Sequence, residues 1–249
     1  MSNPRRICVV GATGLVGRTI IEQAVSRSDV RIVGVARHEM PLPHGARMEM
    51  LIADPSGWDA AIAASNASVL VCALGTTWEK AGKDEAAFRA VDHDLVLLCA
   101  RAAQAAGIGH MIVVSSVGAD PQAKHRYLRV KGEMEGALSR LRLRRVDILR
   151  PGLILGRRAE SRPLERAGQL FAPLLNLFLF GKRRKYRAIS ADTLAQAIFA
   201  LSAQKAGGHF VHEWDAIHYA IRRTGDNRGP VLPPAIDSHR PAIHHGHRR

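Results

Sequence analysis

Cysteine, aromatic residues and long apolar runs are all scarce in this chain of 249 residues. Its three cysteines stand singly inside apolar runs, which predicts buried, reduced thiols and excludes a disulfide framework or a cysteine metal cluster. The longest apolar stretch, residues 170–180, is interrupted by Pro173 and Asn176 and is far shorter than the roughly 20 residues of a membrane-spanning helix. Because no cleavable signal pattern is visible either, we expect a cytoplasmic protein without a membrane partner.

Acidic residues are also few, since 36 lysines and arginines face 22 aspartates and glutamates and leave a net charge of +14. Residues 221–249 hold six of the arginines but only two aspartates, and their prolines and lack of period predict a basic, disordered tail. Aromatic residues do not interleave with the basic runs, as they would in a platform for single-stranded nucleic acid. The charge therefore favours solvated faces and an anionic small ligand over specific nucleic-acid binding.

What is present is the pattern of a parallel sheet with crossover helices, because short β-branched runs alternate with longer amphipathic ones. The predicted strands are residues 6–10, 31–36, 48–53, 69–74, 110–115 and 147–149, and the predicted helices are residues 14–26, 58–64, 85–106, 124–141 and 191–203. We expect an α/β fold with a Rossmann-type, doubly wound parallel sheet. A single domain would span residues 1–220 and include a small C-terminal substrate lobe at about residues 152–220.

A glycine-spaced turn joins the first predicted strand to the first predicted helix. Such a turn lets the backbone approach a pyrophosphate, while the helix offers free N–H groups and the positive end of its dipole. Strand before and helix after make the match specific to dinucleotide binding. The predicted contacts are Gly11, Thr13, Gly14, Leu15, Val16 and Gly17.

The end of the second predicted strand bears on which dinucleotide is bound. Proteins that prefer NAD usually place an acid there for the ribose 2′-hydroxyl, but this chain has Arg37 and His38. Because a cation suits a 2′-phosphate, we expect NADP(H) to be preferred over NAD(H), with Arg37 as the main contact. The alternative is an arginine that simply faces solvent. Leu74 and Gly75, at the end of the fourth strand, would let the cofactor lie close to the backbone.

Candidate catalytic residues follow the fifth predicted strand. Ser115 and Ser116 end that strand, and Tyr127 and Lys131 come four residues apart on the next helix, which places them on one face. An ammonium group beside a phenol favours the phenolate that general acid–base catalysis requires, and a serine hydroxyl can orient a carbonyl oxygen. No metal site is expected.

Together these segments resemble the short-chain dehydrogenase/reductase superfamily, specifically the atypical NAD(P)-binding branch of the Tat-interactive oxidoreductase-like proteins. The resemblance covers residues 5 to about 220 and rests on residues 11–17, 72–77, 80–82, 115–120, 127–133, 149–152 and 160–163.

The resemblance implies hydride transfer to or from a small carbonyl or alcohol. Tyr127 would be the proton donor or acceptor, Lys131 would also bond the nicotinamide ribose, and Ser116, with Ser115 as the alternative, would hold the carbonyl. It further implies cofactor contacts at Ile154 and Arg162. A non-catalytic redox sensor that acts through a protein partner is the alternative function. The substrate is not indicated, and the choice between monomer and homodimer stays open.

Overall fold

The computed structural model describes residues 3–156 and 179–224. In this part of the chain seven strands form one sheet in the order β3-β2-β1-β4-β5-β6-β9, and all neighbouring strands run parallel. The strands are β1 (Arg5–Val10), β2 (Val30–Ala36), β3 (Met48–Ile52), β4 (Val69–Cys72), β5 (His110–Val114), β6 (Arg145–Leu149) and β9 (Gly208–His212). The order reverses direction between β1 and β4, so the predicted Rossmann-type, doubly wound sheet is confirmed.

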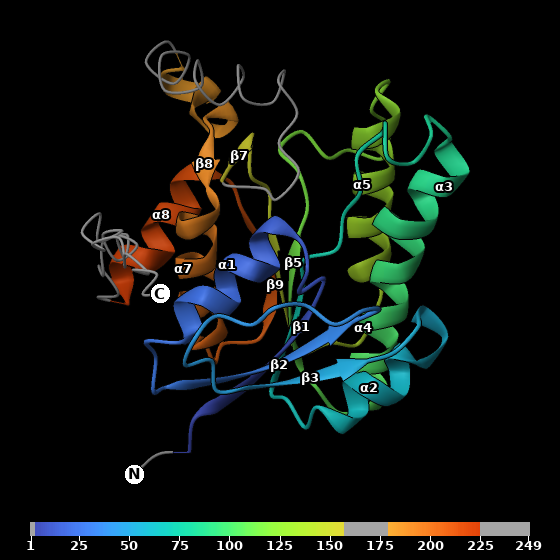
Figure 1. Ribbon diagram of the computed structural model, residues 1–249. Helices are drawn as coiled ribbons and strands as arrows, with labels where there is room; N and C mark the ends of the chain where they lie inside the picture. The colour runs from blue at the N-terminus through green and yellow to red at the C-terminus, as the bar shows by residue number, and fades with distance from the viewer. Residues whose placement is uncertain (1–2, 157–178, 225–249) are drawn as a thin grey trace, which may run out of the picture.

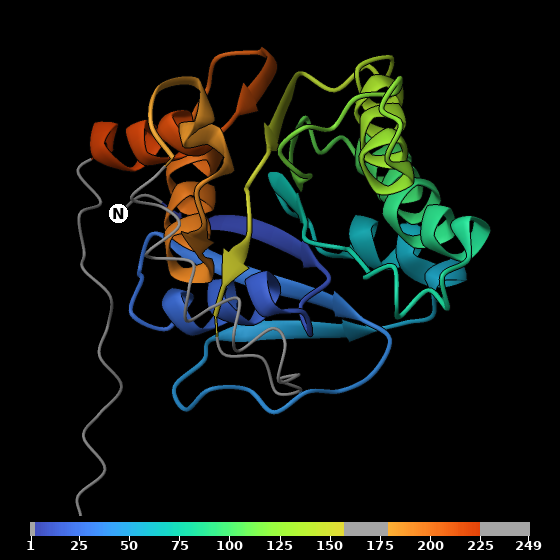
Figure 2. The ribbon, with the colours of Figure 1, turned by 90° about the horizontal axis from the view of Figure 1, so that it is seen from above.

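Helices cover both faces of the sheet (Figure 1). One face is covered by α2 (Trp58–Ala64), α4 (Leu95–Ala105) and α5 (Arg126–Leu138), and the other by α1 (Leu15–Ala24), α7 (Ala191–Ser202) and α8 (Trp214–Arg223). Seen from above, the two helical layers flank the strands (Figure 2). In β1, Ile7 and Cys8 are both buried but belong to opposite cores. Burial on both faces explains why these strands read as continuous apolar runs.

The helix predicted over residues 85–106 is interrupted. It divides into α3 (Glu85–Arg89), a π-helical segment η2 (Ala90–Asp94) and α4. The wider turn of η2 carries Asp92 and His93 into the interior, where both are buried. The helical spacing of apolar residues over residues 85–106 does not reveal this break. Gly107, which follows the end of α4, has φ +73°, in the left-handed region that favours glycine.

The seventh strand, β9, was not predicted. Its residues alternate between half-buried and exposed, because it is an edge strand that pairs only with β6. The helix that precedes it, α7, is capped by Ser190, whose hydroxyl accepts a hydrogen bond from the Thr193 N–H (3.0 Å).

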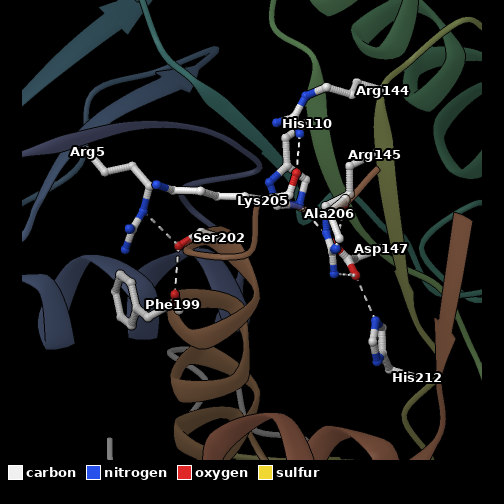
Figure 3. A network of polar contacts seen from close by, with 10 residues as sticks. All are labelled: Arg5, His110, Arg144, Arg145, Asp147, Phe199, Ser202, Lys205, Ala206 and His212. Atoms are coloured by element: carbon white, nitrogen blue, oxygen red, sulfur yellow. Dashed lines mark hydrogen bonds and ion pairs between the residues drawn. The ribbon is translucent and has the colours of Figure 1, made fainter. Parts of the chain in front are cut away.

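A buried charge network links β9 to the centre of the sheet (Figure 3). The fully buried carboxylate of Asp147 on β6 contacts Arg145 (2.6 Å), His110 on β5 (2.7 Å) and His212 on β9 (2.8 Å). Burial by itself would raise the pKa of Asp147, but these hydrogen bonds outweigh burial and hold the pKa well below its ordinary value. The network therefore depends on an ionised carboxylate that no single segment of sequence reveals.

The remaining elements are short. Two strands, β7 (Ile154–Leu155) and β8 (Ile189–Ser190), form a separate parallel pair, and η1 (Pro55–Gly57) and η3 (Gly181–Tyr186) are 3₁₀ helices. Within the range predicted as a substrate lobe, β9 and α7 join the main sheet and its core, and the division itself stays a prediction. The predicted tail lies largely outside the described residues, which end at Thr224. Among the described helices, none has the length and apolar character to span a bilayer.

Candidate functional site

The predicted site residues that the structure describes gather at one edge of the sheet. Because all seven strands are parallel, their carboxyl ends lie at the same edge, and this is where open α/β sheets bind ligands. The glycine turn follows β1, Arg37 follows β2, Leu74 follows β4 and Ser115 follows β5. The topology thus brings together segments that are up to about a hundred residues apart in the chain.

The glycine turn is packed too tightly for side chains. Gly11 has φ +87°, and a Cβ atom there would lie 2.7 Å from the carbonyl oxygen of Ala73. A Cβ atom on Gly17 would lie 2.2 Å from the carbonyl oxygen of Gly11. Gly14 is the N-cap of α1 and makes no side-chain cap, so the first N–H groups of the helix face the turn without a side-chain acceptor. This arrangement fits the pyrophosphate of a dinucleotide.

Arg37 and His38 follow the last residue of β2 and are exposed. Neither side chain has a hydrogen bond or ion pair with any residue in the described ranges. Both are therefore available to an anionic ligand bound at the carboxyl edge.

The segment after β4 packs against the glycine turn, since Ala73 and Leu74 lie next to Gly11. Leu74 is half-buried against the core, Gly75 is exposed, and the N–H of Thr76 donates to Oδ2 of Asp92 (2.8 Å). A Cβ atom on Gly75 would lie 3.5 Å from Oδ1 of the same carboxylate. Asp92 of η2 thus holds this loop in place by its hydrogen bond with the N–H of Thr76.

Lys131 is held by the same carboxylate. Its Nζ lies 2.8 Å from Oδ1 of Asp92, and both side chains are almost fully buried, at 3% and 1% exposed. Burial alone would lower the pKa of Lys131, but the charge of Asp92 outweighs it and holds the pKa above its ordinary value. Nζ also donates to the carbonyl of Val114 at the end of β5 (3.4 Å). Lys131 is therefore a charged ammonium at the strand ends.

Sequence reasoning missed Asp92. Asp92 lies in a run that also contains Arg89 and Asp94, so nothing in the sequence distinguishes its buried side chain from an acid that faces solvent. The spacing of Tyr127 and Lys131 was recognised instead, and Asp92 lies about 40 residues before Lys131. Only the packing of η2 against α5 joins the two.

Tyr127 lies at the start of α5 and is half-buried. Its ring packs against the buried ring of Phe88, with centroids 5.4 Å apart. It also borders a groove of about 570 Å³. The groove is lined by Trp78, Glu79, Lys124, His125, Arg126 and Tyr127.

The two serines differ in their surroundings. Ser115 is buried and its hydroxyl donates to Glu135 of α5, which also accepts a hydrogen bond from Nε of Arg150 (3.1 Å). The hydrogen bond with Glu135, together with its charge, raises the pKa of Arg150. Ser116 is only half-buried and its hydroxyl makes one long contact with the carbonyl of Val117 (3.4 Å). Ser116 is thus the freer hydroxyl.

Two predicted contacts come from the C-terminal part. Ile154 is half-buried in β7 and packs against the core that contains α1, and a Cβ atom on the nearby Gly156 would meet Leu15 of the turn at 2.7 Å. Arg162 lies outside the described residues. Within the described ranges, no group of three or more His, Cys, Asp or Glu side chains could hold a metal ion.

Residues 11–171 match a family model described as NAD(P)H-binding. The chain belongs to the NAD(P)H-binding family. The matched range begins at the first glycine of the turn and includes all the candidate catalytic residues. Membership supports binding of a nicotinamide dinucleotide and does not distinguish NADP from NAD.

Curated relatives in this family include the mitochondrial protein fmp52 of Emericella nidulans. It is 35% identical over 176 residues, which cover 68% of this chain and 75% of that protein. The mitochondrial protein FMP52 of Saccharomyces cerevisiae is 32% identical over 81% of this chain and 85% of that protein. The cytoplasmic location predicted from the sequence is contradicted by these relatives, which are named as mitochondrial proteins. The absence of a secretory signal carried no information on that point.

Solved structures share the fold at low sequence identity. The Bordetella bronchiseptica enzyme WbmG in complex with NAD matches with a TM-score of 0.62 at 17% identity, over 95% of this chain and 83% of that chain. UDP-glucose 4-epimerase from Thermotoga maritima matches with a TM-score of 0.63 at 13% identity, over 94% and 87%. The chain therefore shares the Rossmann-type fold of these solved structures.

Proposed function

We propose that the protein is an NADP(H)-dependent oxidoreductase of the atypical short-chain dehydrogenase/reductase type, in the branch of the Tat-interactive oxidoreductase-like proteins. Its substrate would be a small carbonyl compound or the corresponding alcohol. The observation that carries the proposal is the position of Lys131. Its ammonium group, four residues after Tyr127 on α5, is held by buried Asp92 at the sheet edge that also carries the glycine turn.

The proposed roles follow from the surroundings of each side chain. NADP(H), when bound, supplies or accepts the hydride. Tyr127 gives the substrate oxygen a proton or takes one from it, and Lys131 places a positive charge one helical turn further along α5. We assign the hydroxyl that orients the substrate oxygen to Ser116, because the hydroxyl of Ser115 is committed to Glu135.

The proposed cofactor contacts extend from the glycine turn to the ends of β2, β4 and β7. Arg37 and His38 would bind the 2′-phosphate, because they are exposed and no residue in the described ranges occupies their side chains. Leu74, Gly75 and Ile154 would line the cofactor. The cofactor contact of Arg162 is proposed from the family resemblance alone.

Titration of NADPH and NADH into the protein and its Arg37→Ala variant tests the cofactor preference. Loss of one charge-assisted contact with the 2′-phosphate should weaken NADPH binding by roughly tenfold to 100-fold and leave NADH binding unchanged. Arg140→Ala removes another exposed arginine, which lies beyond the end of α5, and serves as the control. Equal weakening for both nucleotides would contradict the assignment.

Consumption of NADPH across a panel of aldehydes and ketones tests the reaction. Tyr127→Phe should lower kcat by roughly 10²- to 10⁴-fold while NADPH still binds, because the phenyl ring keeps its packing against Phe88. Tight NADPH binding without turnover on any carbonyl would instead favour a regulatory module that senses the nucleotide.

The proposal extends to partners and location. We propose a small-molecule substrate with neither specific nucleic-acid binding nor a membrane partner, and either a monomer or a homodimer, which sedimentation would separate. The names of the relatives suggest a mitochondrial location. Fractionation of cells that produce the protein would test that suggestion.

A further inference from the structure

The groove beside Tyr127 has a composition that points to a class of substrate. Two of its lining residues, Trp78 and Glu79, come from the loop after β4, and the other four are consecutive, from Lys124 before α5 to Tyr127 in its first turn. We infer that this groove binds the non-reacting part of the substrate, and that this part is flat, apolar and negatively charged. An aromatic aldehyde or ketone with an anionic substituent is the simplest such compound. The inference rests on the proposed function and deepens it.

Positive charge dominates the lining. Lys124 and Arg126 are exposed cations on either side of His125, and Glu79 is the one acid among the six lining residues. The side chain of Lys124 has no hydrogen bond or ion pair within the described part of the chain. Lys124 is thus free to bind an anion that enters the groove.

Arg126 is only weakly neutralised. Its Nε lies 3.4 Å from the carboxylate of Glu85, and the same carboxylate makes a shorter contact of 2.7 Å with Arg129. One carboxylate therefore serves two guanidinium groups. Because the Arg126 side chain is 61% exposed, a second anion can approach it from solvent.

Two aromatic residues, Trp78 and Tyr127, line the groove, and the buried ring of Phe88 packs between them. The ring of Trp78 lies 6.2 Å from that of Phe88, and the ring of Phe88 lies 5.4 Å from that of Tyr127. Trp78 is half-buried, so part of its surface faces the groove. The guanidinium of Arg126 lies 6.0 Å from the centroid of the Trp78 ring. A flat substrate that stacks on Trp78 would therefore carry its anionic group to Arg126 and its carbonyl towards Tyr127.

A matched pair of aldehydes tests the inference. We expect 4-carboxybenzaldehyde to be reduced with a kcat/KM about tenfold higher than that of 4-methylbenzaldehyde, which has nearly the same size and no charge. Each exposed cation should contribute about twofold to fivefold. The preference should shrink as salt is added, because screening weakens exposed charge pairs.

A double variant shows whether the groove causes the preference. Lys124→Gln/Arg126→Gln should reduce the ratio of the two kcat/KM values to about one, mainly by raising KM for the carboxylate. The control, Arg140→Gln/Lys205→Gln, removes one arginine and one lysine that are exposed elsewhere, and should keep the parent ratio. Equal kcat/KM values in the parent, or an unchanged ratio in the groove variant, would overturn the inference.

Binding without turnover separates this inference from the proposed function. Quenching of Trp78 fluorescence, identified by its loss in Trp78→Phe, should report tighter binding of 4-methylbenzoate than of 4-methylbenzyl alcohol. Such quenching in a protein that reduces no carbonyl would support the groove and refute the reductase. Reduction of both aldehydes at one rate, without benzoate binding, would support the reductase and refute the charged groove.

Discussion

Removal of the Asp92 carboxylate should destabilise the protein through Lys131. In Asp92→Ala the ammonium of Lys131, only 3% exposed, would remain buried without its counter-ion. Breaking one partner of a buried pair costs about 3–5 kcal/mol of unfolding free energy. The N–H of Thr76 would also lose its acceptor, which adds about 1–3 kcal/mol. The expected loss, about 4–8 kcal/mol, is a large part of the stability of an ordinary domain, about 5–15 kcal/mol.

A second substitution should recover part of the loss. Asp92→Ala/Lys131→Met removes both charges, and apolar replacement of a whole buried pair is often neutral. The double variant should therefore be more stable than Asp92→Ala by about 3 kcal/mol. Asp94→Ala serves as the control, since Asp94 follows two residues later, is 61% exposed and contacts only the adjacent His93 within the described residues. It should lose less than about 1 kcal/mol.

The loss of stability in Asp92→Ala should depend on pH in a definite direction. Since its folded pKa is raised, Lys131 contributes stability that is present below the unfolded pKa of about 10.4 and is lost as pH rises through the folded value. In Asp92→Ala burial would instead lower the folded pKa, so the stability of the variant should increase as pH rises from 7 towards 10. The difference in unfolding free energy between the parent and Asp92→Ala should therefore decrease as pH rises.

Urea unfolding at pH 7 and at pH 9.5, with an unchanged m-value, measures these differences. A parent and Asp92→Ala variant within about 1 kcal/mol of each other would show that Lys131 does not depend on this carboxylate. A double variant no more stable than the single one would contradict the assignment of the loss to an unpaired ammonium.

Three further outcomes are expected. Gly17→Ala should cost about 1–3 kcal/mol or more, because its Cβ would meet a backbone oxygen at 2.2 Å, whereas Gly14→Ala, with 3.3 Å, should cost less; thermal unfolding compares them. Asp147→Asn should lose about 3–5 kcal/mol of unfolding free energy at pH 7. Because the folded pKa of Asp147 is lowered, the parent loses this advantage in acid, and the difference in unfolding free energy should decrease below about pH 4 in acid titrations. Ser116→Ala should lower kcat about 100-fold, whereas Ser115→Ala should reduce urea stability by about 1.5–3 kcal/mol; the reverse pattern would exchange their roles.

The sequence alone predicted the fold class, six of the seven strands of the main sheet and the local segments from which the candidate site is built. The apolar runs of β1 to β6 alternate with helical periods, and this pattern predicts a parallel sheet because both faces of each strand must be covered. The turn from Gly11 to Gly17 is equally local, since its spacing and its place between strand and helix are read along the chain. The pair of Tyr127 and Lys131 is one helical turn apart and needs no tertiary information.

Tertiary structure decided what these local parts contact. Asp92 meets Lys131 only because η2 packs against α5, and Ser115 is separated from Ser116 in role only because Glu135 approaches one of them. The strand β9 forms because a charge network centred on Asp147 and pairing with β6 stabilise a segment with no strong period of its own. Residues far apart in sequence come into contact only where packing of their helices or strands buries them side by side. For that reason the sequence predicted most of the helices and strands and the glycine turn, whereas the tertiary structure decided which charges meet at the candidate site.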